Sequence, residues 1–206
     1  RGYPYSKQGE TYNHSIGEGK VVMNVGLWIG NPDVDSITIL NEGSLNGLPK
    51  TRTIGLKSEE RVMIAKGTYA PINTANTAYS SELLPCIYDT YQGVKVGEFK
   101  LDRYGDIWCN HFMKKIVDMV GDKITIGIPL VEHKREPRDT MIDFKKEIWG
   151  ILVSQRLFEV VESIEMTSKS YFDGYSELIQ HLSAKIDNIC LDSLPIKKYF
   201  QKLLAN

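Results

Sequence analysis

The strongest constraint on the fold is a helical segment that leads directly into a β-prone segment. In DIWCNHFMKKIVDMVG (106–121), large apolar side chains recur at helical spacing, Asp106 stands at the start and Gly121 follows the last turn. The adjoining KITIGIPLVEH (123–133) predicts a strand, which we expect Pro129 to end. A helix followed at once by a strand requires packed layers, so the sequence predicts an α/β or α+β fold.

Further elements flank this pair on both sides. VVMNVGLWIG (21–30) is a continuous β-prone run that predicts a buried strand, and a short helix is expected over 34–41. From residue 143 onward the pattern is helical almost throughout. We therefore divide the chain into an α/β part, 1–142, and a C-terminal helical segment, 143–206, packed on it.

Composition excludes several classes of function. The 206 residues carry a net charge of −1, so a basic surface for nucleic acid is not expected. No apolar run approaches the roughly 18 residues that span a bilayer. Cys86, Cys109 and Cys190 are far apart and form no C-x-x-C pair, which favours buried, reduced thiols. We expect a cytoplasmic protein, with membrane association only through partners as the alternative.

Polar residues at the predicted ends of elements are candidates for chemistry. Asp106 either caps a helix or presents a carboxylate to a cleft as a base or hydroxyl binder. His133, followed by Lys134 and Arg135, is either a structural or exposed histidine or part of a site for a metal–diphosphate unit. The asparagines of NTAN (73–76) either cap backbone groups or bind sugar hydroxyls. These alternatives stay open on the residues alone.

Six short stretches in one order carry a family resemblance. They are RGYPYS (1–6), GLWIGNPDVDS (26–36), NTANTAYSSELLP (73–85), RYGDIWCNHFMKKI (103–116), GIPLVEHKR (127–135) and DFKKEIWGI (143–151). In order and residue type they resemble the reversibly glycosylated polypeptide family, the UDP-arabinopyranose mutases. The resemblance runs from Arg1 to about Gly150.

The resemblance implies a GT-A type glycosyltransferase fold, an α/β layered sheet that uses UDP-sugars with a divalent cation, typically Mn²⁺. In the family the metal-binding Asp-x-Asp type motif lies upstream of the stretch that corresponds to RGYPYS. We therefore expect this chain to be the acceptor-side portion of such a fold with a C-terminal helical tail. It would begin after the UDP- and metal-binding half, and we expect that it does not fold alone.

The resemblance also assigns roles to individual residues. Arg1 matches the arginine that becomes reversibly glycosylated, and Asp106 matches an acceptor-side carboxylate, so both are expected to be catalytic. A guanidinium is an unusual nucleophile because it stays protonated at neutral pH, and an ion-pair role with the leaving diphosphate is the alternative.

Five further residues are expected to bind substrate or metal. Trp28, Asp33 and Asn76 match family positions and are expected to contact the substrate, and Arg135 is expected to contact phosphate. His133 matches a family histidine and is expected to be a metal ligand beside the upstream aspartates.

The sequence also departs from the family pattern. Gly105 stands where the family has the first aspartate of R-Y-D-D. The leading hypothesis is a UDP-sugar mutase, and the alternatives are a glycosyltransferase acting on a glycan or sugar acceptor, a non-catalytic glycan-binding scaffold, or an unrelated α/β domain. Whether the protein forms an oligomer stays open.

Overall fold

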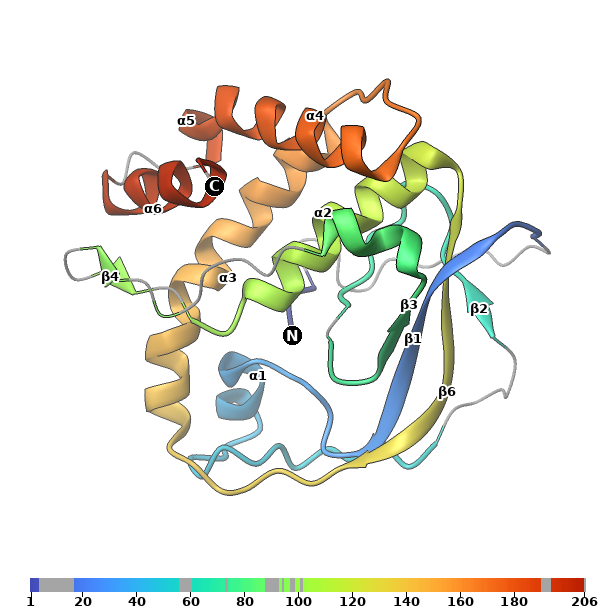
Figure 1. Ribbon diagram of the computed structural model, residues 1–206. Coiled ribbons are helices and arrows are strands. Elements are labelled where there is room, and N and C mark those ends of the chain that lie inside the picture. Colours follow the sequence, from blue (N-terminus) through green and yellow to red (C-terminus); the bar gives the residue numbers. More distant parts are fainter. Residues whose placement is uncertain are drawn as a thin grey trace.

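The protein is described by a computed structural model. It covers residues 1–3, 17–55, 61–72, 74–87, 93, 95–96, 99–100, 102–189 and 194–205. Figure 1 shows a sheet at one side of the molecule and a layer of helices packed beside it. Pro4, Tyr5 and Ser6 of the first motif, Asn73 and Cys190 lie outside the described residues.

The sheet is mixed and contains four strands in the order β2-β6-β1-β3. The two long central strands, β1 (Val21–Gly30) and β6 (Lys123–His133), are parallel. The short strands β2 (Val62–Met63) and β3 (Thr77–Tyr79) pair antiparallel to β6 and β1, respectively. A separate two-stranded sheet joins β4 (Lys95–Val96) to β5 (Phe99–Lys100).

Helices form the second layer (Figure 1). They are α1 (Ser36–Asn41), the 3₁₀-helix η2 (Ser81–Cys86), α2 (Gly105–Val120), α3 (Thr140–Glu162), α4 (Tyr171–Ala184), α5 (Ile186–Ile189) and α6 (Leu194–Leu204). Because parallel strands need a crossover, the chain between β1 and β6 passes through α2 before it enters β6. The predicted α/β class is therefore confirmed.

The core is continuous between the sheet and the helices. Trp108 on α2 is fully buried, stacks on Phe200 of α6 and donates its indole N–H to the hydroxyl of Ser154 on α3. Gly150 lets α3 approach α2 closely, since a Cβ there would lie 2.2 Å from the Tyr104 ring. Helices α3, α4 and α6 thus share one core with α2 and β1, while the boundary at residue 142 stays a prediction.

One expectation about strand length is wrong. β6 does not stop at Pro129 but continues to His133. The proline lies where the pairing with β1 changes register, between the pairs Gly26↔Gly127 and Trp28↔Val131. A proline is tolerated in such an irregular stretch because it interrupts no regular ladder hydrogen bond. The extension places His133 in the sheet, opposite Gly30.

Among the described residues, no helix is both long enough and apolar enough to cross a membrane.

Candidate functional site

The candidate site lies where the two parallel strands end. Because β1 and β6 run in the same direction, Gly30 and His133 meet at one edge of the sheet. The polar segment Asn31–Asp35 follows β1 at this edge and leads into α1. In open α/β sheets, ligands bind outside the carboxyl ends of parallel strands, so this edge is the expected place for a site.

Arg1 is held at this edge by groups from two segments, one that follows β1 and one at the start of α2. Its Nε and Nη2 donate to Oδ2 of Asp33, at 3.3 and 3.2 Å, and Nη2 lies 3.6 Å from Oδ2 of Asp106. Its Nη1 donates to the backbone carbonyl of Arg103. The guanidinium is therefore bracketed by two carboxylates and a carbonyl, with only 10% of the side chain exposed.

Burial and charge act in opposite directions on this cluster. Burial alone would lower the pKa of the Arg1 guanidinium, but Asp33 and Asp106 outweigh it and raise the pKa above its usual value. Burial would likewise raise the pKa of Asp33, but the Arg1 charge outweighs it and the pKa falls below the usual range. Both side chains are therefore charged at neutral pH.

Asp106 does not cap α2. The N-cap position is Tyr104, whose side chain makes no capping hydrogen bond, and Asp106 lies in the first turn of the helix. A carboxylate is stabilised there by the helix dipole without accepting a cap bond. The helix-cap interpretation is thus wrong, and the carboxylate instead approaches Arg1.

Trp28 and His133 form a second wall of the site. The Asn31 carbonyl accepts the Trp28 indole N–H at 3.0 Å and lies 2.8 Å from Nδ1 of His133. The two rings meet edge to face with centroids 5.3 Å apart. Since a carbonyl only accepts, Nδ1 of His133 is the nitrogen that donates to Asn31, and Nε2 is the ring nitrogen that this contact does not use.

These two groups of residues line one pocket of about 290 Å³. Its lining consists of Arg1, Trp28, Asp33, Thr74, Ala75, Asp106, Val131, Glu132 and His133. Five of the seven residues singled out from the sequence therefore come together, although they are spread over more than 130 positions of the chain. The pocket combines an aromatic wall, one buried cation and several hydrogen-bonding groups, which is the composition of a site for a polar small molecule.

The other two predicted residues do not line this pocket. The side-chain amide of Asn76 donates to the carbonyl of Leu27 at 2.8 Å, and the backbone carbonyl of Asn76 accepts from the Gly26 N–H, so Asn76 binds the backbone of β1. The Arg135 guanidinium lies 3.5 Å from Asp143 on α3. Burial, followed by nearby arginine charges, lowers the pKa of Arg135, which still leaves it protonated at neutral pH.

The described residues do not form a complete metal site. No three histidine, cysteine, aspartate or glutamate side chains among them lie close enough to hold one ion. Nε2 of His133 can supply one ligand, but Asp33 and Asp106 face the Arg1 charge, and Glu132 lies 3.5 Å from Nζ of Lys134. A divalent cation at this edge would need ligands from outside the described residues.

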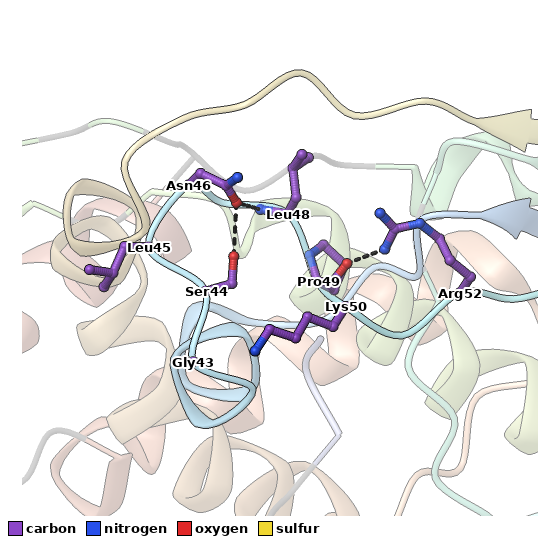
Figure 2. Close-up of a pocket in the computed structure, with 8 residues that line it drawn as sticks. All are labelled: Gly43, Ser44, Leu45, Asn46, Leu48, Pro49, Lys50 and Arg52. Carbon is purple, nitrogen blue, oxygen red and sulfur yellow. Dashed lines mark hydrogen bonds between the residues drawn. The ribbon is translucent and has the colours of Figure 1, made fainter.

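A larger pocket, of about 480 Å³, lies at the end of α1 and contains none of the predicted site residues. Figure 2 shows that its polar groups bind one another: Ser44 donates to Asn46, and Arg52 donates to the Pro49 carbonyl. Asn46 also accepts from the Leu48 backbone N–H at 3.2 Å. These contacts fold the loop that carries them, so we assign the site to the pocket beside Arg1.

Sequence reasoning missed two residues that support the site, Arg103 and Glu147. Both lie within the motifs that carry the resemblance, but neither was given a role. One signal was available: Asp143 and Glu147 are spaced i, i+4, which places two carboxylates on one helix face. Both are buried, and buried carboxylates need partners.

The comparisons with known proteins identify the family. The model for "Reversibly glycosylated polypeptide" matches residues 1–191, so the chain belongs to this family. The match extends well beyond Gly150, where the resemblance was expected to end, and includes most of the helical segment. The family membership inferred from the six motifs is therefore confirmed.

The curated relatives carry UDP-arabinopyranose mutase names, at modest identity. UDP-arabinopyranose mutase 1 of Arabidopsis thaliana is 29% identical over 98% of this chain and 50% of its own length. UDP-arabinopyranose mutase 3 of the same plant is 28% identical over 92% of this chain and 48% of its own. A rice relative named "Probable inactive UDP-arabinopyranose mutase 2" is 24% identical over 82% of this chain. The chain spans about half the length of the curated relatives it matches.

Proposed function

We propose that this chain forms the sugar-handling part of a UDP-sugar mutase, built on a GT-A type fold, and that Arg1 is the residue that receives the sugar. The observation that supports this most is the Arg1 guanidinium, which lines a pocket between two carboxylates at the ends of parallel strands. Membership of the reversibly glycosylated polypeptide family and the names of the relatives favour the same reaction class.

In the proposed reaction, the bond between the sugar anomeric carbon and the UDP oxygen breaks, and a bond to a guanidinium nitrogen of Arg1 forms. The nitrogen must lose a proton as it is alkylated, and Asp106, 3.6 Å from Nη2, is placed to accept it. UDP leaves as an anion. Ring opening and reclosure then exchange the pyranose and furanose forms. The returning UDP oxygen bonds to the anomeric carbon, the bond to the Arg1 nitrogen breaks, and that nitrogen takes back the proton from Asp106.

The other pocket residues would bind and orient the sugar. The Trp28 ring offers an apolar face, and Nε2 of His133 is a hydrogen-bond acceptor when the ring is neutral. Asp33 keeps Arg1 in place through its two contacts. A divalent cation such as Mn²⁺ would neutralise the diphosphate, but we assign it no step because no three candidate ligands among the described residues lie close enough to hold it.

A second candidate is sugar-nucleotide binding without transfer. The raised pKa of Arg1 favours this alternative, because a guanidinium held in its protonated form is a good anion partner and a poor nucleophile. In that case the Arg1 guanidinium would contact the diphosphate, and no covalent bond between the protein and the sugar would form. A glycosyltransferase in which Asp106 orients an acceptor hydroxyl would also leave Arg1 unmodified.

Labelling with a UDP-sugar separates these proposals. The full-length protein is incubated with UDP-[¹⁴C]arabinopyranose, and the protein-bound label is measured for the wild type, Arg1→Lys and Asp106→Asn. The mutase proposal predicts label on the wild type, none on Arg1→Lys, and a rate lowered by about 10²-fold or more in Asp106→Asn. The matched control Arg52→Lys, which changes an arginine of the other pocket, should label normally.

Two outcomes would contradict the mutase proposal. If UDP-sugar raises the melting temperature of the wild type but no label is retained, the protein binds the nucleotide sugar without transfer. If Arg1→Lys retains the label and peptide mapping finds it at a residue other than position 1, another residue carries the sugar.

A further inference from the structure

Glu147 lies on α3 outside the lining of the Arg1 pocket, and its side chain is fully buried. Its Oε2 accepts two hydrogen bonds from Ser36, one from the backbone N–H at 2.8 Å and one from the hydroxyl at 2.7 Å. Ser36 is the first residue of α1, three positions after Asp33. Through Ser36, Oε2 of Glu147 therefore anchors the segment between β1 and α1, in which Asp33 contacts Arg1.

The other oxygen of Glu147 faces Arg103. Oε1 lies 3.1 Å from Nε of Arg103, and Oδ1 of Asp143, one turn earlier on α3, lies 2.7 Å from its Nη1. The Arg103 guanidinium thus forms ion pairs with two carboxylates of the same helix, and Oε1 of Glu147 approaches it as a charge without a hydrogen bond among the described residues. Ion pairs between groups this well buried are held much more firmly than exposed ones.

Arg103 also has an unusual backbone conformation, and its N–H donates to Oδ1 of Asp102 at 3.0 Å. Arg103 has a φ of 66°, the only non-glycine residue with positive φ among the described residues. That conformation costs an L-residue on the order of 1 kcal/mol, so it persists only where surrounding contacts impose it. The Arg103 carbonyl, which leads from this residue into α2, is the group that accepts from Nη1 of Arg1.

We propose that Glu147 is the positioning residue of the Arg1 site. It holds Arg103 in the left-handed conformation and binds Ser36, the first residue of α1. The segment between β1 and α1, which carries Asp33, and the segment before α2, which carries Arg103, therefore stay at a fixed separation around the Arg1 guanidinium. Glu147 itself does not line the pocket. It contacts Ser36 and Arg103, and its charge also helps to raise the pKa of the Arg1 guanidinium. The catalytic consequence rests on the proposed function, whereas the positioning of Arg1 does not.

The test therefore measures the position of Arg1 separately from sugar transfer. The full-length protein is treated with phenylglyoxal, which modifies accessible guanidinium groups, and the rate at Arg1 is followed by peptide mass spectrometry. Glu147→Gln keeps the side-chain shape and an oxygen for Ser36 but removes the charge that faces Arg103. We expect Arg1 to be modified about tenfold faster, as for the loss of one charge-assisted contact.

A matched control and a rescue make the result specific. Glu159→Gln changes an exposed glutamate of the same helix and should leave the Arg1 rate unchanged. Glycine adopts positive φ without strain, so Arg103→Gly permits this backbone conformation without the ion pairs of the Arg103 side chain. In the double variant Glu147→Gln/Arg103→Gly, the Arg1 rate should return to within about threefold of the wild type.

A residue that merely stabilised the fold would behave differently. Its loss would raise the modification rate of every buried arginine together, and Arg103→Gly would add to the damage instead of offsetting it. Either pattern, or an unchanged Arg1 rate in Glu147→Gln, would overturn the proposal. If Glu147→Gln does not fold, Ser36→Ala tests the α1 contact alone, and an unchanged Arg1 rate there would count against the proposal.

Sugar transfer gives the second readout. If the wild type becomes labelled, Glu147→Gln should lower kcat with little change in KM, because the pocket walls remain while Arg1 loses its alignment. If the wild type is never labelled, the mutase proposal fails, yet the phenylglyoxal rates still decide the role of Glu147.

Discussion

Acid should destabilise the protein through His111, a histidine of α2 that plays no part in the proposed reaction. Its ring is almost completely buried between Tyr69 and Phe158, and neither ring nitrogen has a hydrogen-bond partner among the described residues. Burial, reinforced by the charges of Lys114 and Lys115, lowers the pKa of His111 to about 3. The folded protein therefore keeps this histidine neutral where the unfolded chain would protonate it.

The sign and size follow from proton linkage. The unfolded chain takes up a proton near pH 6.5 and the folded protein only near pH 3, so stability is complete above pH 6.5 and is lost as the pH falls. Each pH unit below 6.5 costs about 1.4 kcal/mol, which gives about 2 kcal/mol at pH 5. Glu162 lies 3.7 Å from Nε2, but its side chain is 40% exposed and water screens its charge.

Urea unfolding followed by tryptophan fluorescence measures this slope. The free energy of unfolding should fall by about 2 kcal/mol between pH 7 and pH 5 in the wild type, beyond the change seen in His111→Leu. The variant replaces a buried, unpartnered ring by an apolar side chain, so it should be at least as stable at pH 5 as the wild type. Equal pH slopes in the two proteins would show that His111 is protonated in the folded state and would refute the reasoning.

The remaining predictions concern packing and thiol reactivity. Gly150→Ala should lower the free energy of unfolding by about 1–3 kcal/mol, because the new Cβ would lie 2.2 Å from the Tyr104 ring. Gly174→Ala should lower it less, because the new Cβ would meet the flexible end of the Met119 side chain. Equal losses for the two variants in urea unfolding would contradict this difference. Burial raises the pKa of Cys86 to about 11, so iodoacetamide at pH 8 should alkylate it far more slowly in the folded protein than in urea, and equal rates would be incompatible with its burial.

Local patterns predicted the central elements well. The helix over 106–121 and the strand that follows it were readable because apolar spacing, Gly121 and the β-prone run all agree with the tertiary structure. Pro129 misled the prediction of the strand end because a register irregularity, which depends on the partner strand, absorbs the proline. The sequence alone does not reveal that partner.

The site was only partly predictable. The family motifs indicated Arg1, Asp33 and Asp106, but no local pattern reveals that Arg103 adopts positive φ or that Glu147 reaches across to Ser36. Such contacts join positions about one hundred residues apart, so they appear only once the fold brings them together. Asn76 shows the converse, since a polar residue in a motif here binds the backbone of its own sheet.

The most direct test of the account is the location of the sugar. The full-length protein is incubated with UDP-arabinopyranose, digested, and mapped by tandem mass spectrometry, with Asp106→Asn in parallel. The proposed reaction predicts a pentose on the Arg1 guanidinium, present in the wild type and strongly reduced in Asp106→Asn. A pentose on any other residue, or an unmodified Arg1 in a protein that demonstrably interconverts the two sugar forms, would contradict it.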